Sequence, residues 1–234
     1  MKSQMRILLT IVFLTLITTN LKAQNPSESH IGSWYNYSIH HRLSERFSLN
    51  PWAELRLYET SSNYNLAYIS LRGNYHIKSN QTLGLAYAYL DIDTVFEFDH
   101  QPNVHEHRIY EQYTYNKTKS KLNIQHRARF EQRFLDFSDR NELQNRFRYR
   151  LSLKYNLSNT IFINVSEEPF VNFQDQVFHE NRFYSGFGFN VTSHSQLQIG
   201  YLKQHIRKNN LNRIQVGISF KTDNRKQKAT LAQL

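Results

Sequence analysis

Two segments between Lys121 and Asn156 alternate polar and apolar residues one by one, which limits the folds open to this chain. The polar positions of the first segment are Asn123, Gln125, Arg127, Arg129, Glu131 and Arg133, and its apolar positions are Leu122, Ile124, Ala128, Phe130 and Phe134. In the second segment Arg146, Arg148, Arg150, Ser152 and Lys154 alternate with Phe147, Tyr149, Leu151, Leu153 and Tyr155. Successive side chains of a strand point to opposite faces, so the pattern predicts two antiparallel strands with one apolar and one charged face each.

The same alternation recurs along the chain. A soluble sandwich could accommodate one such hairpin, but in a transmembrane barrel lipid meets the apolar face and the lumen takes the polar face of every strand. We therefore predict an all-β fold, a single antiparallel transmembrane β-barrel of about 10–12 strands. The predicted strands are 32–42, 47–58, 63–77, 82–91, 105–116, the two segments within 121–156, 160–168, 180–191, 195–205 and 211–220.

The strand count is eleven, whereas single-chain bacterial barrels have even numbers of strands. Either a twelfth strand lies in a long connection, or the first segment stays outside a closed ten-stranded barrel. Glu111 is a second difficulty, because alternation puts it on the lipid face of the fifth strand. A β-bulge or a position at the rim would remove that conflict.

The two ends of the chain differ from the barrel segment. Residues 1–23 have a basic start and an apolar run from Ile7 to Ile17, which predicts a secretory signal peptide and export to the outer membrane of a Gram-negative bacterium. A retained membrane anchor is the alternative. The barrel is assigned to residues 24–220 and a basic tail to residues 221–234. Of the formal charge of +10, only +4 falls on residues 24–220, so the basic composition predicts no nucleic-acid partner.

The main functional signal is a ladder of inward arginines. It comprises Arg127, Arg129, Arg133, Arg146, Arg148 and Arg150, with Arg108, Arg182 and Arg72 from other strands. Guanidinium groups match carboxylate and phosphate oxygens, so the ladder predicts an anion path, with small inward residues (Gly84, Ala86, Ala88, Gly186 and Gly188) leaving room. The alternative is a structural ladder, in which the arginines pair with the lumen counter-charges Glu131, Glu106 and Glu54 and close the lumen.

Other chemistry has weaker support. His105 and His107, with His100, Asp99 and Glu106 nearby, have a spacing that can hold a metal, but we expect solvated rim residues. Rim residues Ser138 and His179, with Asp136 and Asp139, leave open a lipid-modifying enzyme. The chain has no cysteine and no hydrolase, zinc or phosphate-loop motif, so we expect no catalytic residue, metal or cofactor. The acidic 91–99 connection could bind a cation or a partner, and a solvated loop is the simpler interpretation.

Several local sequences also resemble a known family. They are Ile31–Tyr35, Trp52–Arg56, Gln125–Phe134, Arg146–Arg150, Glu180–Phe189 and Leu197–Tyr201. Together they resemble an uncharacterised family of predicted outer-membrane barrels common in Bacteroidetes, catalogued as domain of unknown function 2490. The resemblance implies a fold and a compartment, but neither a substrate nor catalytic residues.

The expected function is a small channel or binding barrel for anionic solutes. The alternative is a plugged structural or assembly barrel without transport. Expected partners are outer-membrane lipid, lipopolysaccharide, the barrel-insertion machinery and small anionic solutes.

Overall fold

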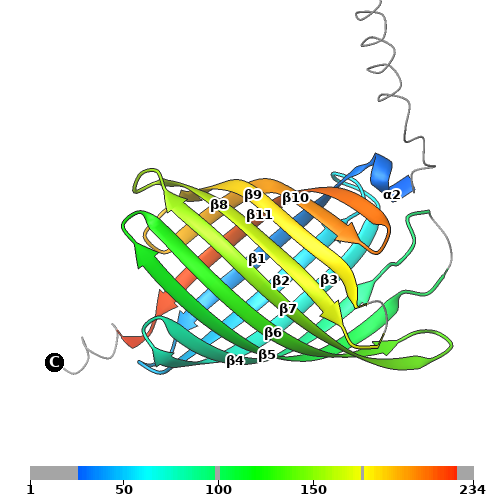
Figure 1. Cartoon of the computed structure of the whole chain (residues 1–234), viewed down its shortest axis with the longest axis horizontal. Helices are drawn as coiled ribbons and strands as arrows, with labels where there is room; N and C mark the ends of the chain where they lie inside the picture. The colour runs from blue at the N-terminus through cyan, green and yellow to red at the C-terminus, as the bar shows by residue number, and fades with distance from the viewer. Residues whose placement is uncertain (1–25, 98–100, 175–176, 226–234) are drawn as a thin grey trace, which may run out of the picture.

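The computed structural model describes residues 26–97, 101–174 and 177–225 and contains one closed β-barrel of eleven strands (Figure 1). The short helix α2 (Pro26–Ser29) precedes the first strand. The strands are β1 (Ile31–Arg42), β2 (Phe47–Leu57), β3 (Tyr64–Lys78), β4 (Gln81–Ile92), β5 (Val104–Lys119), β6 (Leu122–Asp136), β7 (Asn141–Asn156), β8 (Ile161–Asn172), β9 (Phe178–Asn190), β10 (Ser195–Ile206) and β11 (Asn209–Asp223). The predicted all-β barrel is confirmed. The described residues contain no helix long and apolar enough to cross a membrane.

The barrel closes with an odd number of strands. Neighbouring strands alternate in direction from β1 to β11, so the first and last strands run the same way and pair in parallel, from Ile31–Asn212 to Arg42–Asp223. Both predicted ways of restoring an even number are therefore wrong: the first segment joins the barrel, and no twelfth strand lies among the described residues. The odd count also puts α2 and the end of β11 at opposite ends of the barrel (Figure 1).

The two ends of the barrel carry different connections. Residues 43–46, 79–80, 120–121, 157–160 and 191–194 connect strands at one end, which we call the turn end. Residues 58–63, 93–103, 137–140, 173–177 and 207–208 connect strands at the other, the loop end. Turns of two to four residues fill the first end, whereas the longest connection at the second has eleven residues. This asymmetry is typical of outer-membrane barrels.

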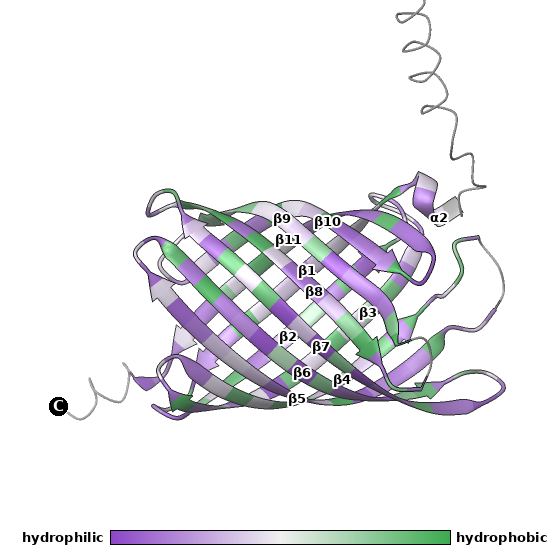
Figure 2. Cartoon of the chain, in the orientation of Figure 1, coloured by the Kyte–Doolittle hydropathy of each residue, from purple (hydrophilic) through white to green (hydrophobic). Residues whose placement is uncertain are grey.

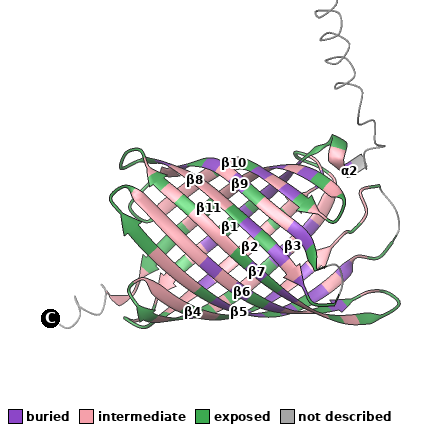
Figure 3. Ribbon diagram, viewed as in Figure 1, coloured by how far each residue is buried: buried purple, intermediate pink, exposed green. Residues whose placement is uncertain are grey.

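The faces of the strands are as predicted. Polar and apolar residues alternate along the strands in Figure 2, and buried and exposed residues alternate in Figure 3. Outward residues such as Leu85, Ile69 and Phe187 are more than half exposed, as expected of a wall that faces lipid. The side chains of Glu106 and Glu131 point inward and are 0% exposed.

Glu111 remains on the outer face. β5 pairs with β4 and β6 without a register shift, and Glu111 lies between Leu85 and Phe130 in the middle of the strand. The expected bulge or rim position is therefore wrong. Glu167 of β8 also points outward, where its carboxylate accepts a hydrogen bond from Asn181 Nδ2 at 2.5 Å.

Two prolines interrupt the ladder of backbone hydrogen bonds. At Pro51 the pairing of β1 with β2 is broken, and the side chain of Asn50 donates to the Ile39 carbonyl at 2.6 Å in place of the missing backbone donor. At Pro169 the pairing of β7 with β8 is broken. β8 nevertheless continues to Asn172, beyond the predicted end at residue 168, and brings Phe170 into the interior with 0% exposure.

The small inward residues make room for large side chains and not for an open path. A Cβ on Gly188 would lie 2.0 Å from the ring of Phe162, and one on Gly186 would lie 2.5 Å from the Tyr184 hydroxyl. Ala86 and Ala88 pack in a cluster with Tyr68, Leu90 and Tyr110. The prediction that these positions widen a channel is therefore wrong for this part of the lumen.

The predicted signal peptide, residues 1–23, lies outside the described residues, as do residues 226–234 of the predicted tail. β11 extends to Asp223, so the first residues after Phe220 are part of the barrel wall. Arg225 then bridges Asp223 at 2.6 Å and Glu45 at 2.8 Å.

Candidate functional site: the barrel lumen

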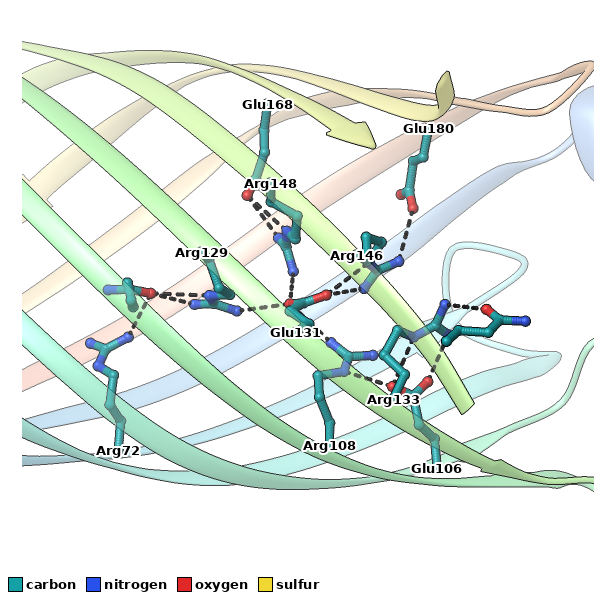
Figure 4. A network of polar contacts seen from close by, with 12 residues as sticks. Arg72, Glu106, Arg108, Arg129, Glu131, Arg133, Arg146, Arg148, Glu168 and Glu180 are labelled. Carbon is teal, nitrogen blue, oxygen red and sulfur yellow. Dashed lines mark hydrogen bonds and ion pairs between the residues drawn. The ribbon is translucent and has the colours of Figure 1, made fainter. Parts of the chain in front are cut away.

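An ion-pair network crosses the lumen near the loop end (Figure 4). Its centre is Glu131, whose Oε2 lies 2.6 Å from Arg146 Nη2 and whose Oε1 lies 2.9 Å from Arg148 Nη1. Arg108 and Arg129 approach the same carboxylate at 3.5 Å. Four guanidinium groups thus surround one carboxylate that is 0% exposed. Such an arrangement offsets the cost of taking charges out of water only because each group keeps several partners.

Three further carboxylates complete this network. Glu106 binds Arg108 at 2.6 Å and Arg133 at 2.7 Å. Glu168 binds Arg127 and also Arg148, the latter at 2.9 Å. Glu180 binds Arg182 at 2.5 Å and lies 3.8 Å from Arg146. We use the term Arg–Glu network for Glu106, Glu131, Glu168 and Glu180 with Arg108, Arg127, Arg133, Arg146, Arg148 and Arg182.

Sequence reasoning missed Glu168 and Glu180 as counter-charges. They stand at the ends of the predicted strands 160–168 and 180–191, where alternation already turns both side chains inward, and β8 and β9 extend beyond them. Phe170 was missed because β8 continues past the predicted end at residue 168. The guanidinium groups of Arg146, Arg148 and Arg182 lie 5.0, 4.4 and 4.6 Å from its ring centre, so a buried aromatic face supports three cations.

Glu54, a predicted counter-charge of the ladder, has a different place. It binds Arg56 of its own strand at 2.5 Å. The Arg56 guanidinium in turn lies 3.8 Å from the ring centre of Trp34. Glu54 therefore points inward as predicted, and among the described residues its ion pair is with Arg56 and not with a predicted ladder arginine.

Between the network and the turn end lies a cavity of about 680 Å³. Its lining includes Asn156 and Lys221 near the turn end but not Glu106, Glu131 or Glu180, so the cavity ends at the Arg–Glu network. Ten lysines and arginines line it, against two glutamates. The cationic residues are Arg56, Arg72, Arg108, Arg127, Arg129, Arg148, Arg150, Lys154, Arg182 and Lys221. Among the described residues, the lining therefore carries an excess of positive charge.

Three arginines of the cavity have mainly neutral partners. Arg72 donates to Asn74 Oδ1 at 2.8 Å, to Gln112 Oε1 at 3.2 Å and to the Asn50 amide oxygen. Arg129 donates to Gln112 at 2.7 Å, and Arg150 donates to Gln125 at 2.8 Å. Amide oxygens carry no charge, so these three cations are less compensated than those of the network.

The nine predicted ladder arginines all line the interior, but they divide into two groups. Arg108, Arg127, Arg133, Arg146, Arg148 and Arg182 each make a close ion pair with a network carboxylate. Arg129 and Arg150 hydrogen-bond to amides. The first group therefore matches the predicted structural ladder, in which arginines pair with carboxylates. In the second group, which includes Arg72, the guanidinium groups bond mainly to neutral acceptors.

The other candidate sites are not assembled. The side chains of His105 and His107 point outward, where they share hydrogen bonds with the hydroxyls of Tyr89 and Tyr87, whereas Glu106 points inward. His100 and Asp99 lie outside the described residues, and no group of three potential metal ligands occurs among the residues that are described. No hydrogen bond within the described part of the chain joins Ser138 to His179, which is buried against Phe170.

The acidic connection is tied to the rim at its first residues. Asp91 accepts from the Tyr64 hydroxyl at 2.9 Å, and the backbone carbonyl of Asp93 accepts from the Tyr58 hydroxyl at 3.0 Å. Burial, with Asp93 nearby, raises the pKa of Tyr58 to about 12, so this hydroxyl stays a donor at neutral pH. Asp91 therefore stabilises the rim of the barrel through this hydrogen bond.

Comparison with known proteins identifies a similar fold and a family. No curated protein matches this chain. A solved structure described as the NanC porin is similar in fold, with a TM-score of 0.51 and 13% sequence identity over 82% of this chain and 98% of that chain. At that identity the likeness concerns the fold alone, which is a closed β-barrel. Residues 31–215 match a family of unknown function, and the chain belongs to this family, described as "Protein of unknown function (DUF2490)".

Proposed function

We propose that this protein is an outer-membrane channel for small anionic solutes. The cavity is the binding region, and the Arg–Glu network is the narrow part of the path. The observation that carries the proposal is the charge of the cavity lining, ten lysines and arginines against two glutamates. A cavity with this excess attracts anions and repels cations. The likeness to a porin supports a channel-type barrel.

The location and partners follow from the same proposal. An apolar outer wall and a closed sheet suit a bilayer, because no edge strand is left with unsatisfied backbone groups. The predicted signal peptide would direct export, and the barrel-insertion machinery would assemble the chain among outer-membrane lipid and lipopolysaccharide in a Gram-negative host. Arg129 and Arg150, with Arg72, would contact the solute.

A plugged structural barrel is the second candidate. It is favoured by the 0% exposure of Glu106 and Glu131, since fully enclosed carboxylates leave no water at the centre of the network. In that case the network closes the lumen permanently, and the cavity is a blind pocket.

Reconstitution in a planar lipid bilayer separates the two candidates. Under a potassium chloride gradient, the channel should give a reversal potential close to that of chloride. Arg72→Gln combined with Arg129→Gln should shift this potential toward zero. Arg140→Gln should not, because Arg140 lies in the exposed connection 137–140 at the loop end. Cation selectivity would overturn the proposal. Absence of conductance from correctly folded protein would favour the plugged barrel.

A further inference from the structure

Gln112 of β5 occupies an unusual position inside the cavity. Its single side-chain carbonyl oxygen accepts hydrogen bonds from two guanidinium groups on different strands, Arg72 Nη1 at 3.2 Å and Arg129 Nη2 at 2.7 Å. Arg129 Nε donates to the same oxygen at 3.1 Å. In Figure 4 the dashed lines from Arg72 and Arg129 end on the same acceptor oxygen. Two positive charges thus converge on a neutral atom.

The two guanidinium groups are held in place independently of Gln112. The guanidinium carbon of Arg129 lies over the ring of the buried Tyr110, 4.0 Å from the ring centre, which is a stabilising cation–π contact. Arg72 is held by the amide oxygens of Asn74 and Asn50. Gln112 itself is 7% exposed and also donates from Nε2 to Thr114 at 3.0 Å. If the Gln112 side chain turned away, the pair would keep its geometry.

The positive charge of this pair is only weakly compensated. The described residues give Arg72 no carboxylate partner at ion-pair distance, and the nearest carboxylate of Arg129 is Glu131 at 3.5 Å, which three other arginines share. The Nε and Nη edge of a guanidinium binds a carboxylate through two parallel hydrogen bonds, which are stronger than bonds to an amide. A bound carboxylate would present a separate oxygen to each of the two arginines, whereas Gln112 presents a single oxygen to both.

We propose that Arg72 and Arg129 form a carboxylate-binding site, and that the Gln112 side chain holds the position of the ligand oxygen until an acidic solute displaces it. The inference rests on the proposed function for the nature of the solute. It concerns equilibrium binding and does not require passage through the network. The ligand class is a small solute with a carboxylate, such as a sugar acid.

Isothermal titration of the full mature chain in detergent tests the site with D-glucuronate, and D-glucose serves as the neutral counterpart. Glucuronate should bind and glucose should not. Gln112→Glu supplies a permanent carboxylate to the two arginines and should weaken glucuronate binding about tenfold or more. Gln112→Ala removes the competing oxygen and should leave binding equal or tighter. The heat-dependent shift of the barrel on a denaturing gel checks that each variant is folded.

Gln198→Glu is the matched control, because it adds the same charge to the same cavity on β10, where the Gln198 side-chain oxygen accepts a hydrogen bond from Asn164 Nδ2 at 3.3 Å and not from an arginine. It should change the affinity by less than about twofold, since a solvated charge at a distance is well screened. Equal weakening by Gln112→Glu and Gln198→Glu would overturn the site, as would loss of binding in Gln112→Ala. Inorganic phosphate binding more tightly than glucuronate would overturn the carboxylate assignment.

Failure of this site and failure of the channel have different signatures. Glucuronate binding without conductance contradicts the channel and leaves the site standing. Anion-selective conductance with no effect of Gln112→Glu on glucuronate binding contradicts the site and leaves the channel standing.

Discussion

Glu131 on β6 and Arg146 on β7 are directly opposite cross-strand neighbours, and their side chains meet at 2.6 Å inside the barrel. The next two inward positions pair arginine with arginine, Arg129 with Arg148 and Arg127 with Arg150. Like charges directly opposite each other destabilise a sheet. Glu131 interacts with four arginines and therefore offsets the repulsion between the positive charges of the β6–β7 hairpin.

Glu131→Gln should destabilise the barrel by about 3 kcal/mol or more, because it leaves buried guanidinium groups without their shared counter-charge. Urea unfolding in lipid vesicles measures the change in the free energy of unfolding. Glu142→Gln is the control, since Glu142 makes its ion pair with Arg140 at an exposed rim and should have no measurable effect. Similar stabilities for the two variants would contradict the role assigned to the network.

Gly188→Ala should destabilise the barrel by about 1–3 kcal/mol, because the added methyl group would meet the Phe162 ring at 2.0 Å. The ring has little room to move, since it is 0% exposed and lies 3.6 Å from Lys154 Nζ. Gly217→Ala, also inward, has 3.7 Å to its nearest neighbour and should be neutral within about 0.5 kcal/mol. Thermal unfolding in detergent distinguishes them, and a neutral Gly188→Ala would refute the tight packing.

The parallel closure predicts a specific disulfide. Tyr37 and Ile218 are register partners across β1 and β11, and the chain has no native cysteine to compete. The double variant Tyr37→Cys and Ile218→Cys should cross-link under mild oxidation, because paired strand positions fall within disulfide distance. Mobility on a non-reducing gel reports the bond. Tyr37→Cys with Tyr201→Cys should not cross-link, since β10 does not pair with β1; the opposite result would rule out this closure.

Glu111→Leu should stabilise the barrel in lipid by about 1 kcal/mol, because a carboxylate on the lipid face is unfavourable. The residue lies between outward Leu85 and Phe130, so leucine would continue the apolar wall. Unfolding in vesicles is the measurement, and Glu111→Gln separates the charge from the size of the side chain. If leucine proved destabilising, Glu111 would have a partner on the outer wall.

Local alternation was enough to predict the strands and their faces. Arg127, Arg129, Arg148 and Arg150 point inward because the period of two is unbroken through β6 and β7. The sequence also contained the acidic partners Glu106 and Glu131, which lie on neighbouring strands. These relations depend on residues that are close in sequence or adjacent in a hairpin.

Relations that depend on the packing of several strands were beyond the same reasoning. Glu168 of β8 reaches Arg127 of β6, 41 residues away, and Glu180 of β9 lies near Arg146 of β7, in each case past the strand between them. Phe162 fills the space at Gly188 because their strands pair, which composition alone does not reveal. The pairing of β1 with β11 joins strands from opposite ends of the barrel sequence, so no local pattern could predict whether the number of strands is even or odd.

The proposed function requires the lumen to present excess positive charge to small anions. The only two tryptophans of the chain, Trp34 and Trp52, both line the cavity, so their fluorescence reports on it. Quenching of the folded protein by iodide should exceed quenching by caesium, with neutral acrylamide as the reference for access. Raising the ionic strength should reduce the difference. Equal quenching by the two ions, or stronger quenching by caesium, would contradict an anion-attracting interior.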